Sequence, residues 1–262
     1  MLPIIEFLGR EISMYAVFAT VGILVSGFAF CRYVDKKGYD DNDAIVFMLI
    51  VAVGVLLGGH ILYTLTNLDK LYMLTEIKSF KEFLTTLSLV SGGSVFYGGL
   101  MGGILAGGVF IKLKRLPRDI YLDGCALLAP LFHGFARIGC FFAGCCYGIE
   151  SEFGFVAQNN ELTGIGSVRR FPVQLLESIE NFTVALVMLI LIKKKKLGSY
   201  LFYIYLIIYS ILRFINEFLR GDEIRGFVLG LSTSQFISII IFAVVGTALI
   251  IKKIKQKKEK VK

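Results

Sequence analysis

Residues 43–66 have the sequence DAIVFMLIVAVGVLLGGHILYTLT, in which Asp43 is the only charged residue. A helix needs about 20 largely apolar residues to cross roughly 30 Å of hydrocarbon, and this stretch is long enough to do so. Six further stretches meet the same criterion, and the seven together lie at about residues 12–31, 43–66, 88–111, 120–141, 174–192, 199–220 and 233–251. The sequence therefore predicts an all-α polytopic membrane protein with seven transmembrane helices.

The composition favours the same class. Hydrophobic residues make up 56% of the 262 residues and charged residues 18%, against about 45–50% and about 25% in a typical soluble domain. The stretches between the expected spans are too short to hold a core of their own. We therefore expect residues 1–262 to form a single integral membrane domain that ends in a basic tail at 252–262.

The distribution of Lys and Arg predicts the orientation of the spans. Of the 28 basic residues, 18 fall on the side of the C-terminus, 7 on the opposite side and 3 inside spans. Cytoplasmic loops carry the excess of Lys and Arg, so we expect the N-terminus outside and the C-terminus in the cytoplasm. The net charge of +8 lies in short runs between apolar stretches, which indicates contact with anionic membrane lipids and no nucleic-acid binding.

In this orientation each expected span carries its unusual polar residues toward its outer end. From the first span to the last these are Tyr15, His60, GGSVFYGG (92–99), Arg137 with Cys140, FPVQLLE (171–177), Arg213 with Glu217 and Arg220, and Gln235. Scattered structural polar residues are not expected to share one depth. We therefore expect one outward-facing cavity to which all the spans contribute.

Arg213, Glu217 and Arg220 are spaced i, i+4 and i+7, which places them on one face of a helix. A charged residue at the centre of a membrane costs at least about 2.5–3.5 kcal/mol, so such residues usually face protein or water and are paired. One interpretation is a ladder that only locks helices together. The interpretation we favour is that the surplus positive charge, with Arg137, binds an anion such as a lipid phosphate through bidentate hydrogen bonds.

The third expected span carries eight glycines between residues 92 and 108. Their small-xxx-small spacing predicts close helix packing for the deeper pairs. Gly92 and Gly93, at the mouth of the span, are expected to form a loop where a ligand can approach the backbone. On the fourth span His133 shares a face with Arg137 and Cys140, and we interpret it as a partner in a helix–helix hydrogen bond.

Three of the five cysteines cluster at Cys140, Cys145 and Cys146. The spacing leaves open a disulfide, a metal site with His133, or reactive thiols. No Cys-x-x-Cys pair is present, so we predict no metal site and no cofactor. The cluster is expected on the oxidising side of the membrane, where a Cys140–Cys145 disulfide remains an alternative.

At these residues the sequence resembles the phosphatidylglycerol–prolipoprotein diacylglyceryl transferases of bacterial plasma membranes, from about residue 10 to residue 240. Tyr15 falls where that family has an essential tyrosine, and Gln235 matches a glutamine that opens the last span. The remaining elements are GGSVFYGGLMGG (92–103), ARIGCFFAGCCYG (136–148), FPVQLLE (171–177) and RFINEFLR (213–220). They resemble the family's GG-x-SFHGGL-x-G, GRxGNFxNxExxG, HPxQLYE and R-x3-E-x2-R elements in the same order.

Several positions depart from the family pattern. The family's histidine in SFHGG is Tyr97 here, its signature Asn is Cys140 and its signature Glu is Cys145. The histidine of HPxQLYE is Phe171, and an arginine of the second span is His60. The arginine positions are kept, while several polar groups that the family uses in the reaction are replaced.

The resemblance implies an enzyme that transfers the diacylglyceryl group of phosphatidylglycerol to the lipobox cysteine of a prolipoprotein signal peptide. It also implies a location in the bacterial plasma membrane, with the active site toward the extracytoplasmic side. The catalytic residues it implies are Tyr97, Arg137, Arg213 and Glu217, and the substrate-binding residues are Tyr15, Gly98, Arg137, Gly139, Gly148, Gln174 and Arg220. A related transferase with another acceptor, or a non-catalytic lipid-binding protein, would also fit the retained residues.

Overall fold

The computed structural model describes residues 4–7, 9–68, 79, 82, 86, 95–156, 168–195, 197–221, 227–228 and 230–259, without the side chains of 7, 96–97, 227–228 and 255–259. The chain divides into two compact units. The larger unit comprises Met1–Tyr33 with Leu122–Lys262, and the smaller unit comprises Val34–Tyr121. Each unit is considered by itself below.

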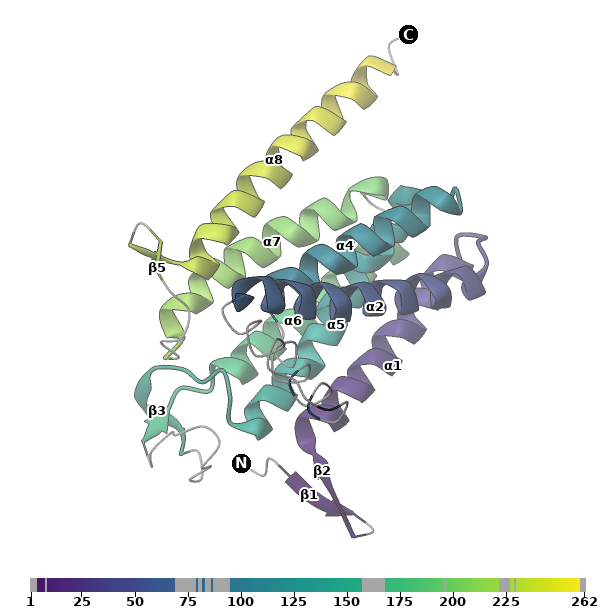
Figure 1. The fold of residues 1–262 in the computed structure, drawn as a ribbon. Helices are drawn as coiled ribbons and strands as arrows, with labels where there is room; N and C mark the ends of the chain where they lie inside the picture. The colour runs from purple at the N-terminus through teal and green to yellow at the C-terminus, as the bar shows by residue number, and fades with distance from the viewer. Residues whose placement is uncertain are drawn as a thin grey trace. The chain divides into compact units, whose positions relative to one another are not determined.

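The protein is mostly helical, and a helix occurs at each of the seven expected stretches (Figure 1). The helices of the described residues are α1 (Met14–Asp35), α2 (Asp41–Thr66), α4 (Phe96–Leu113), α5 (Arg118–Ala143), α6 (Val173–Lys193), α7 (Leu201–Asn216) and α8 (Thr233–Glu259). Single 3-10 turns, η2 (Gly198–Tyr200) and η3 (Glu217–Leu219), extend α7 at its two ends. Within the described residues six of these helical segments are long and apolar enough to cross a membrane, and the apolar part of α4 is shorter.

Within the described residues three short antiparallel hairpins accompany the helices, so the chain is mostly helical and not strictly all-α. They are β1 (Ile4–Phe7) with β2 (Arg10–Ser13), β3 (Glu150–Val156) with β4 (Arg169–Arg170), and β5 (Phe227–Val228) with β6 (Leu231–Ser232). Glu150 and Phe155 of β3 both pair with Arg170, so the register of that hairpin is irregular. The hairpins lie outside the long apolar stretches, and strands of two to seven residues leave little periodicity in the sequence.

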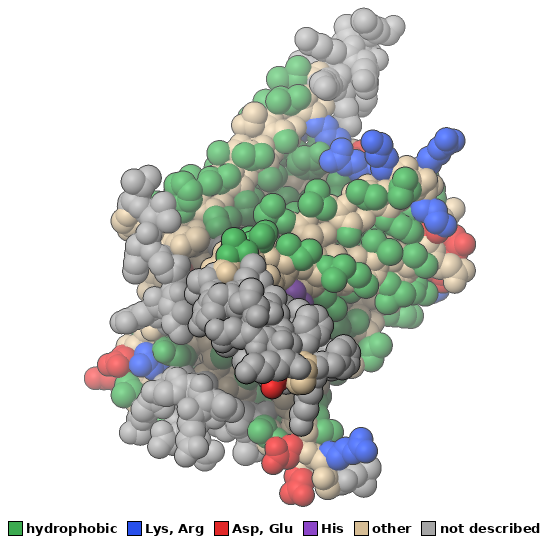
Figure 2. All heavy atoms as spheres, in the orientation of Figure 1, with side chains coloured by type: hydrophobic (Ala, Val, Ile, Leu, Met, Phe, Trp, Pro, Cys, Tyr) green, Lys and Arg blue, Asp and Glu red, His purple; other side chains and the backbone are tan. Residues whose placement is uncertain are grey.

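The helices present apolar side chains outward. In α2 the side chains of Leu49, Leu56 and Ile61 are exposed, and in α4 so are those of Met101 and Ile104. Figure 2 shows such hydrophobic side chains spread over the sides of the helices. A protein surrounded by water rarely exposes so large an apolar surface, whereas a bilayer covers it with hydrocarbon. The structure therefore agrees with a multi-pass membrane protein.

Glycines bring α2 and α4 together in the smaller unit. A methyl group at Gly98 would overlap the carbonyl oxygen of Gly58, and one at Gly102 would overlap the carbonyl oxygen of Gly54. Only residues without a Cβ permit this approach, so the prediction of close packing is confirmed for these glycines. Gly92 and Gly93, predicted to form a loop, lie outside the described residues.

In the larger unit a core forms between α5, α6 and α7. Its buried members are Ala126 from α5, Val184 and Met188 from α6, and Leu201 and Tyr205 from α7. Next to this core the hydroxyl of Ser178 on α6 donates a hydrogen bond of 2.9 Å to the carbonyl oxygen of Gly134 on α5. This packing places the polar faces of the three helices against one another.

Candidate active site

Three arginines of the larger unit meet around Glu177, near the start of α6. The Nε atom of Arg137 on α5 lies 2.6 Å from Glu177 Oε2. Nη1 of Arg220 and Nη1 of Arg213 lie 3.4 Å and 3.6 Å from Glu177 Oε1. Only 4% of the Glu177 side chain is exposed. The structure thus joins residues from three separate parts of the chain, and we call Arg137, Arg213, Arg220, Glu177 and Glu217 the arginine cluster.

Glu217 is the second carboxylate of the cluster. Its Oε2 lies 2.8 Å from Nη2 of Arg213, which confirms that the i, i+4 spacing brings these two side chains together. Nη2 of Arg213 also donates a 2.7 Å hydrogen bond to the hydroxyl of Ser234 on α8. Two glutamates against three arginines leave one surplus positive charge in the cluster.

One donor of the cluster has no hydrogen-bond partner among the described residues. Nη1 of Arg213 is buried and makes no hydrogen bond within the described part of the chain, although it lies 3.6 Å from Glu177. A buried guanidinium N–H that is left without an acceptor costs free energy, so such groups usually have a partner. An oxygen of an anionic ligand would supply that partner.

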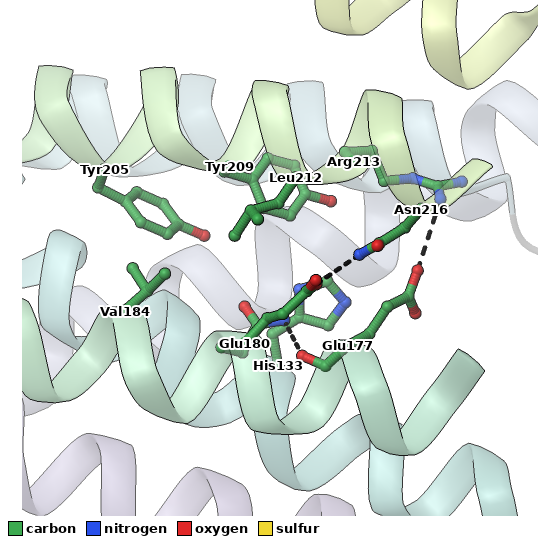
Figure 3. A pocket seen from close by; sticks show the side chains of 10 residues that line it. His133, Glu177, Glu180, Val184, Tyr205, Tyr209, Leu212, Arg213 and Asn216 are labelled. Atoms are coloured by element: carbon green, nitrogen blue, oxygen red, sulfur yellow. Dashed lines mark hydrogen bonds and ion pairs between the residues drawn. The ribbon is translucent and has the colours of Figure 1, made fainter. Parts of the chain in front are cut away.

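A small pocket lies beside the cluster, between α6, α7 and α5 (Figure 3). Its polar lining is His133, Glu177, Glu180, Asn181, Tyr205, Tyr209, Arg213 and Asn216. Its volume is about 10 Å³, which is room for about one water molecule. A phospholipid headgroup is larger, so its binding here requires the lining side chains to separate.

His133 makes a contact other than the predicted helix–helix bond. Its Nε2 accepts a 3.1 Å hydrogen bond from Nε of Arg137, one turn along the same helix. The ring of Tyr209 on α7 lies 5.8 Å away, centroid to centroid. The prediction that His133 bonds to another helix was wrong, because side chains four residues apart on one helix also lie next to each other. His133 helps to orient the Arg137 guanidinium.

Gln174 and Gly148 support the backbone around the cluster. The Gln174 side chain is 1% exposed, and its Nε2 donates a 2.8 Å hydrogen bond to the carbonyl oxygen of Cys145. A methyl group at Gly148 would overlap the carbonyl oxygen of Phe171 and lie 2.9 Å from that of Leu219. Gly148 also forms an antiparallel bridge with Arg220, so it fixes the segment that carries this arginine.

Tyr15 and Gly139 meet in the larger unit, where a methyl group at Gly139 would lie 3.2 Å from the Cα atom of Tyr15. Gly98 and His60 belong to the smaller unit, in α4 and α2. The backbone of Tyr97 lies in α4, but its side chain is outside the described residues.

A sequence model of the prolipoprotein diacylglyceryl transferases matches residues 3–252. The chain belongs to this family. It is 36% identical over 263 residues to phosphatidylglycerol–prolipoprotein diacylglyceryl transferase 2 of Clostridium perfringens, covering 97% of this chain and 96% of that protein. It is 33% identical over 235 residues to the phosphatidylglycerol–prolipoprotein diacylglyceryl transferase of Clostridium tetani, covering 89% and 90% of the two chains. The transferase of Geobacter sulfurreducens is 29% identical over 240 residues.

The sequence patterns of this family member predict no catalytic or binding role for two residues at the centre of the site. Glu177 stands out in the sequence only as a retained position of FPVQLLE, and His133 only as a structural histidine. The signal for Glu177 is a carboxylate at the start of an apolar span, in a chain whose spans carry surplus arginines.

Gln235 has a structural role. Its Oε1 accepts a hydrogen bond from the backbone N–H of Ser232, and the Ser232 hydroxyl accepts one from the backbone N–H of Gln235. This reciprocal pair is a capping box at the start of α8.

The cysteine cluster follows the end of α5. All five cysteines of the chain are described, and all are free thiols, so the alternative of a Cys140–Cys145 disulfide is not observed. Hydrogen bonds from the thiols of Cys140 and Cys145, then the charges of Arg137 and Arg220, lower the pKa of the Cys146 thiol. Hydrogen bonding to Cys140 and Cys146 raises the pKa of the Cys145 thiol.

Proposed function

We propose that this chain transfers the diacylglyceryl group of phosphatidylglycerol to the lipobox cysteine of a prolipoprotein signal peptide. Membership of the family supports the reaction, and the names of the relatives include both substrates. The observation that carries the proposal to particular residues is the surplus positive charge around Glu177, with a buried Arg213 N–H that makes no hydrogen bond within the described residues.

The reaction sets two requirements. A C–S bond forms between the thiol sulfur and the terminal glycerol carbon of the lipid, while the C–O bond from that carbon to phosphate breaks. The electron pair of the C–O bond leaves with glycerol phosphate, and the thiol proton passes to a base. The site therefore needs cations at the departing phosphate and a group that accepts a proton.

We assign the phosphate to the arginine cluster. Arg137 is the leading ligand, Arg213 and Arg220 assist it, and Glu217 orients Arg213 through the 2.8 Å ion pair. Glu177 holds the three guanidinium groups together before the lipid binds. Phosphate oxygens would replace part of these contacts as the pocket opens, so the arginines need little reorganisation when charge develops.

Tyr97 is the proposed proton acceptor because it stands at the position of the family's histidine. A tyrosine is a weak base unless positive charges lie nearby, so the role depends on arginines close to its hydroxyl. Substrate binding is assigned to Tyr15, Gly98, Gly139, Gly148 and Gln174 because they stand at the family's substrate-binding positions. The three glycines pack closely against neighbouring protein atoms, and Gln174 holds the Cys145 backbone.

The proposal includes the membrane topology. We place residues 1–262 in the bacterial plasma membrane as one domain of seven spans, with α4 as the third, the N-terminus outside and the tail 252–262 in the cytoplasm. Lys252 supports one detail of this arrangement. Its Nζ donates a 2.7 Å hydrogen bond to the carbonyl oxygen of Ser199 and lies 5.1 Å from the centre of the Tyr203 ring. The tail thus starts beside the first turn of α7, which follows the lysines at 193–196.

A transferase with a different acceptor is the second candidate. The observation that favours it is the replacement of the family's His, Asn and Glu by Tyr97, Cys140 and Cys145. The phosphate site is shared by both candidates, so they differ only in the nucleophile that attacks the lipid.

The test uses purified protein in detergent, phosphatidylglycerol and a peptide that carries a lipobox cysteine. We expect the peptide mass to increase by one diacylglyceryl group, and no increase for a peptide with Ser in place of Cys. Arg137→Ala should lower the rate by about 100-fold or more, whereas Arg169→Ala, on exposed β4, should leave it unchanged. Lipid cleavage without peptide modification would favour the second candidate. Near-normal transfer by Arg137→Ala would remove Arg137 from the mechanism.

A further inference from the structure

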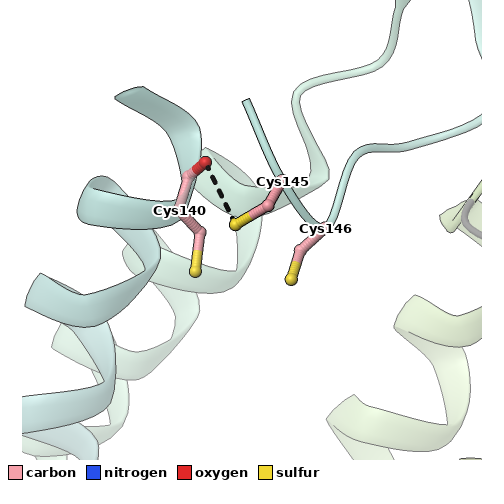
Figure 4. A group of neighbouring side chains, drawn as sticks. All are labelled: Cys140, Cys145 and Cys146. Carbon is pink, nitrogen blue, oxygen red and sulfur yellow. Dashed lines mark hydrogen bonds between the residues drawn. The ribbon is translucent and has the colours of Figure 1, made fainter. Parts of the chain in front are cut away.

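Three sulfur atoms of the larger unit converge at the end of α5. The Sγ atoms of Cys140, Cys145 and Cys146 all lie within 4.8 Å of one another (Figure 4). Three thiolates bound to one ion with Zn–S bonds of about 2.3 Å are about 3.8–4.0 Å apart. Small side-chain rotations therefore suffice to place all three on one metal ion. The spacing in the sequence could not show this, because it contains no Cys-x-x-Cys pair.

The backbone holds the three residues in this arrangement. The N–H of Cys145 donates to the carbonyl oxygen of Cys140 at 3.2 Å, and Gln174 holds the carbonyl of Cys145 at 2.8 Å. Gly144 and Cys146 have φ values of +71° and +58°, so the chain turns sharply on both sides of Cys145. A left-handed conformation is unfavourable for cysteine and persists only where the surroundings impose it. It brings the third sulfur back to the other two.

Positive charge lies beside one of the three thiols. Metal ligands of this kind must lose their protons, and nearby positive charge lowers the cost of that loss. Arg137 and Arg220 are close enough to act on Cys146. Cys140 is buried, and Cys145 and Cys146 are half-buried, so an ion can reach the sulfur atoms from one side. The cluster is therefore accessible as well as preorganised.

We infer that Cys140, Cys145 and Cys146 form a site for one thiophilic metal ion, and that Zn²⁺ is the ion that this donor set fits. Thiolates select soft or borderline metals, and three protein ligands leave a fourth position of the tetrahedron for water. A disulfide would use two of the three sulfur atoms and leave the third without a role.

This inference goes beyond the proposed lipid transfer and is tested without it. The full chain is purified in detergent, reduced, freed of metal with a chelator and titrated with Co²⁺, whose thiolate complexes absorb visibly and in the near ultraviolet. We expect a thiolate-to-cobalt absorption band that saturates at one ion per chain and is abolished by an equimolar amount of Zn²⁺. Removing a group that only orients a metal ligand weakens metal binding by about 10–100-fold, so loss of a ligand itself in Cys146→Ser should weaken Co²⁺ binding at least about 100-fold.

The matched control is Cys31→Ser, whose cysteine lies on α1 outside the sulfur cluster, and which should bind Co²⁺ as the unaltered protein does. If Cys146→Ser does not fold, Cys145→Ser tests the same site. The inference is overturned if no charge-transfer band forms, or if Cys31→Ser weakens it as much as the cluster variants do. It is also overturned if protein purified without reductant contains a disulfide between two of the three cysteines.

Discussion

Replacing Glu177 with Gln would remove the carboxylate that contacts all three arginines of the cluster while keeping the shape of the side chain. The contacts of 2.6, 3.4 and 3.6 Å each correspond to an attraction of about 5–6 kcal/mol at an effective dielectric constant near 20. Much of this is offset by the desolvation of four buried charges. Removing one partner of a buried ion pair typically destabilises a protein by about 3–5 kcal/mol, and we expect a loss of that size.

The assay is unfolding of the purified protein in mixed micelles by increasing amounts of a denaturing detergent, followed by the loss of far-ultraviolet circular dichroism. The matched control is Glu180→Gln, one turn further along α6. Glu180 accepts a hydrogen bond from Asn216, and a glutamine oxygen can accept the same bond, so we expect a change of less than about 1 kcal/mol. If the two variants had equal free energies of unfolding, the convergence of charges on Glu177 would not be what holds α5, α6 and α7 together.

Three further predictions concern the surroundings of the site. Gly148→Ala should destabilise the protein by about 2 kcal/mol or more, because the added methyl group overlaps the Phe171 carbonyl. The control is Gly246→Ala on α8, where the added methyl group meets open space. It should leave the free energy of unfolding unchanged or raise it in the same assay. Gln235→Ala should cost about 0.5–2 kcal/mol through loss of the capping box, and no change would show that α8 starts without it. The lowered pKa of Cys146 keeps its thiolate populated as the pH falls. Its alkylation by iodoacetamide, followed by peptide mass spectrometry in reduced and metal-free protein, should therefore change little between pH 8 and pH 6, whereas an ordinary thiol slows about tenfold per pH unit.

The positions of the helices could be predicted because the signal is local. A run of about 20 apolar residues predicts a span wherever it occurs, and α2 at Asp41–Thr66 agrees with the expected 43–66. The hairpins could not be predicted in this way. The pairing of Glu150 and Phe155 with Arg170 joins residues across a loop, and the strands are too short to show a period.

The site was predictable to the extent that its residues share one helix. Arg213 and Glu217 form the ion pair that their spacing indicates. The contact of Glu177 with Arg137, 40 positions away in the sequence, depends on how α5 and α6 are rotated against each other. His133 was assigned to another helix because its spacing gives no preference between a partner on its own helix and one across an interface.

The sequence by itself determined the class of protein, the apolar helices and the surplus of positive charge inside them, because hydropathy and charge are properties of single residues and short runs. It also carried the motifs through which the family could be identified. Only the tertiary structure decided that three arginines share Glu177 and that three sulfur atoms meet beyond the end of α5. Such meetings depend on helix rotation and on the left-handed backbone at Cys146, which no local pattern encodes.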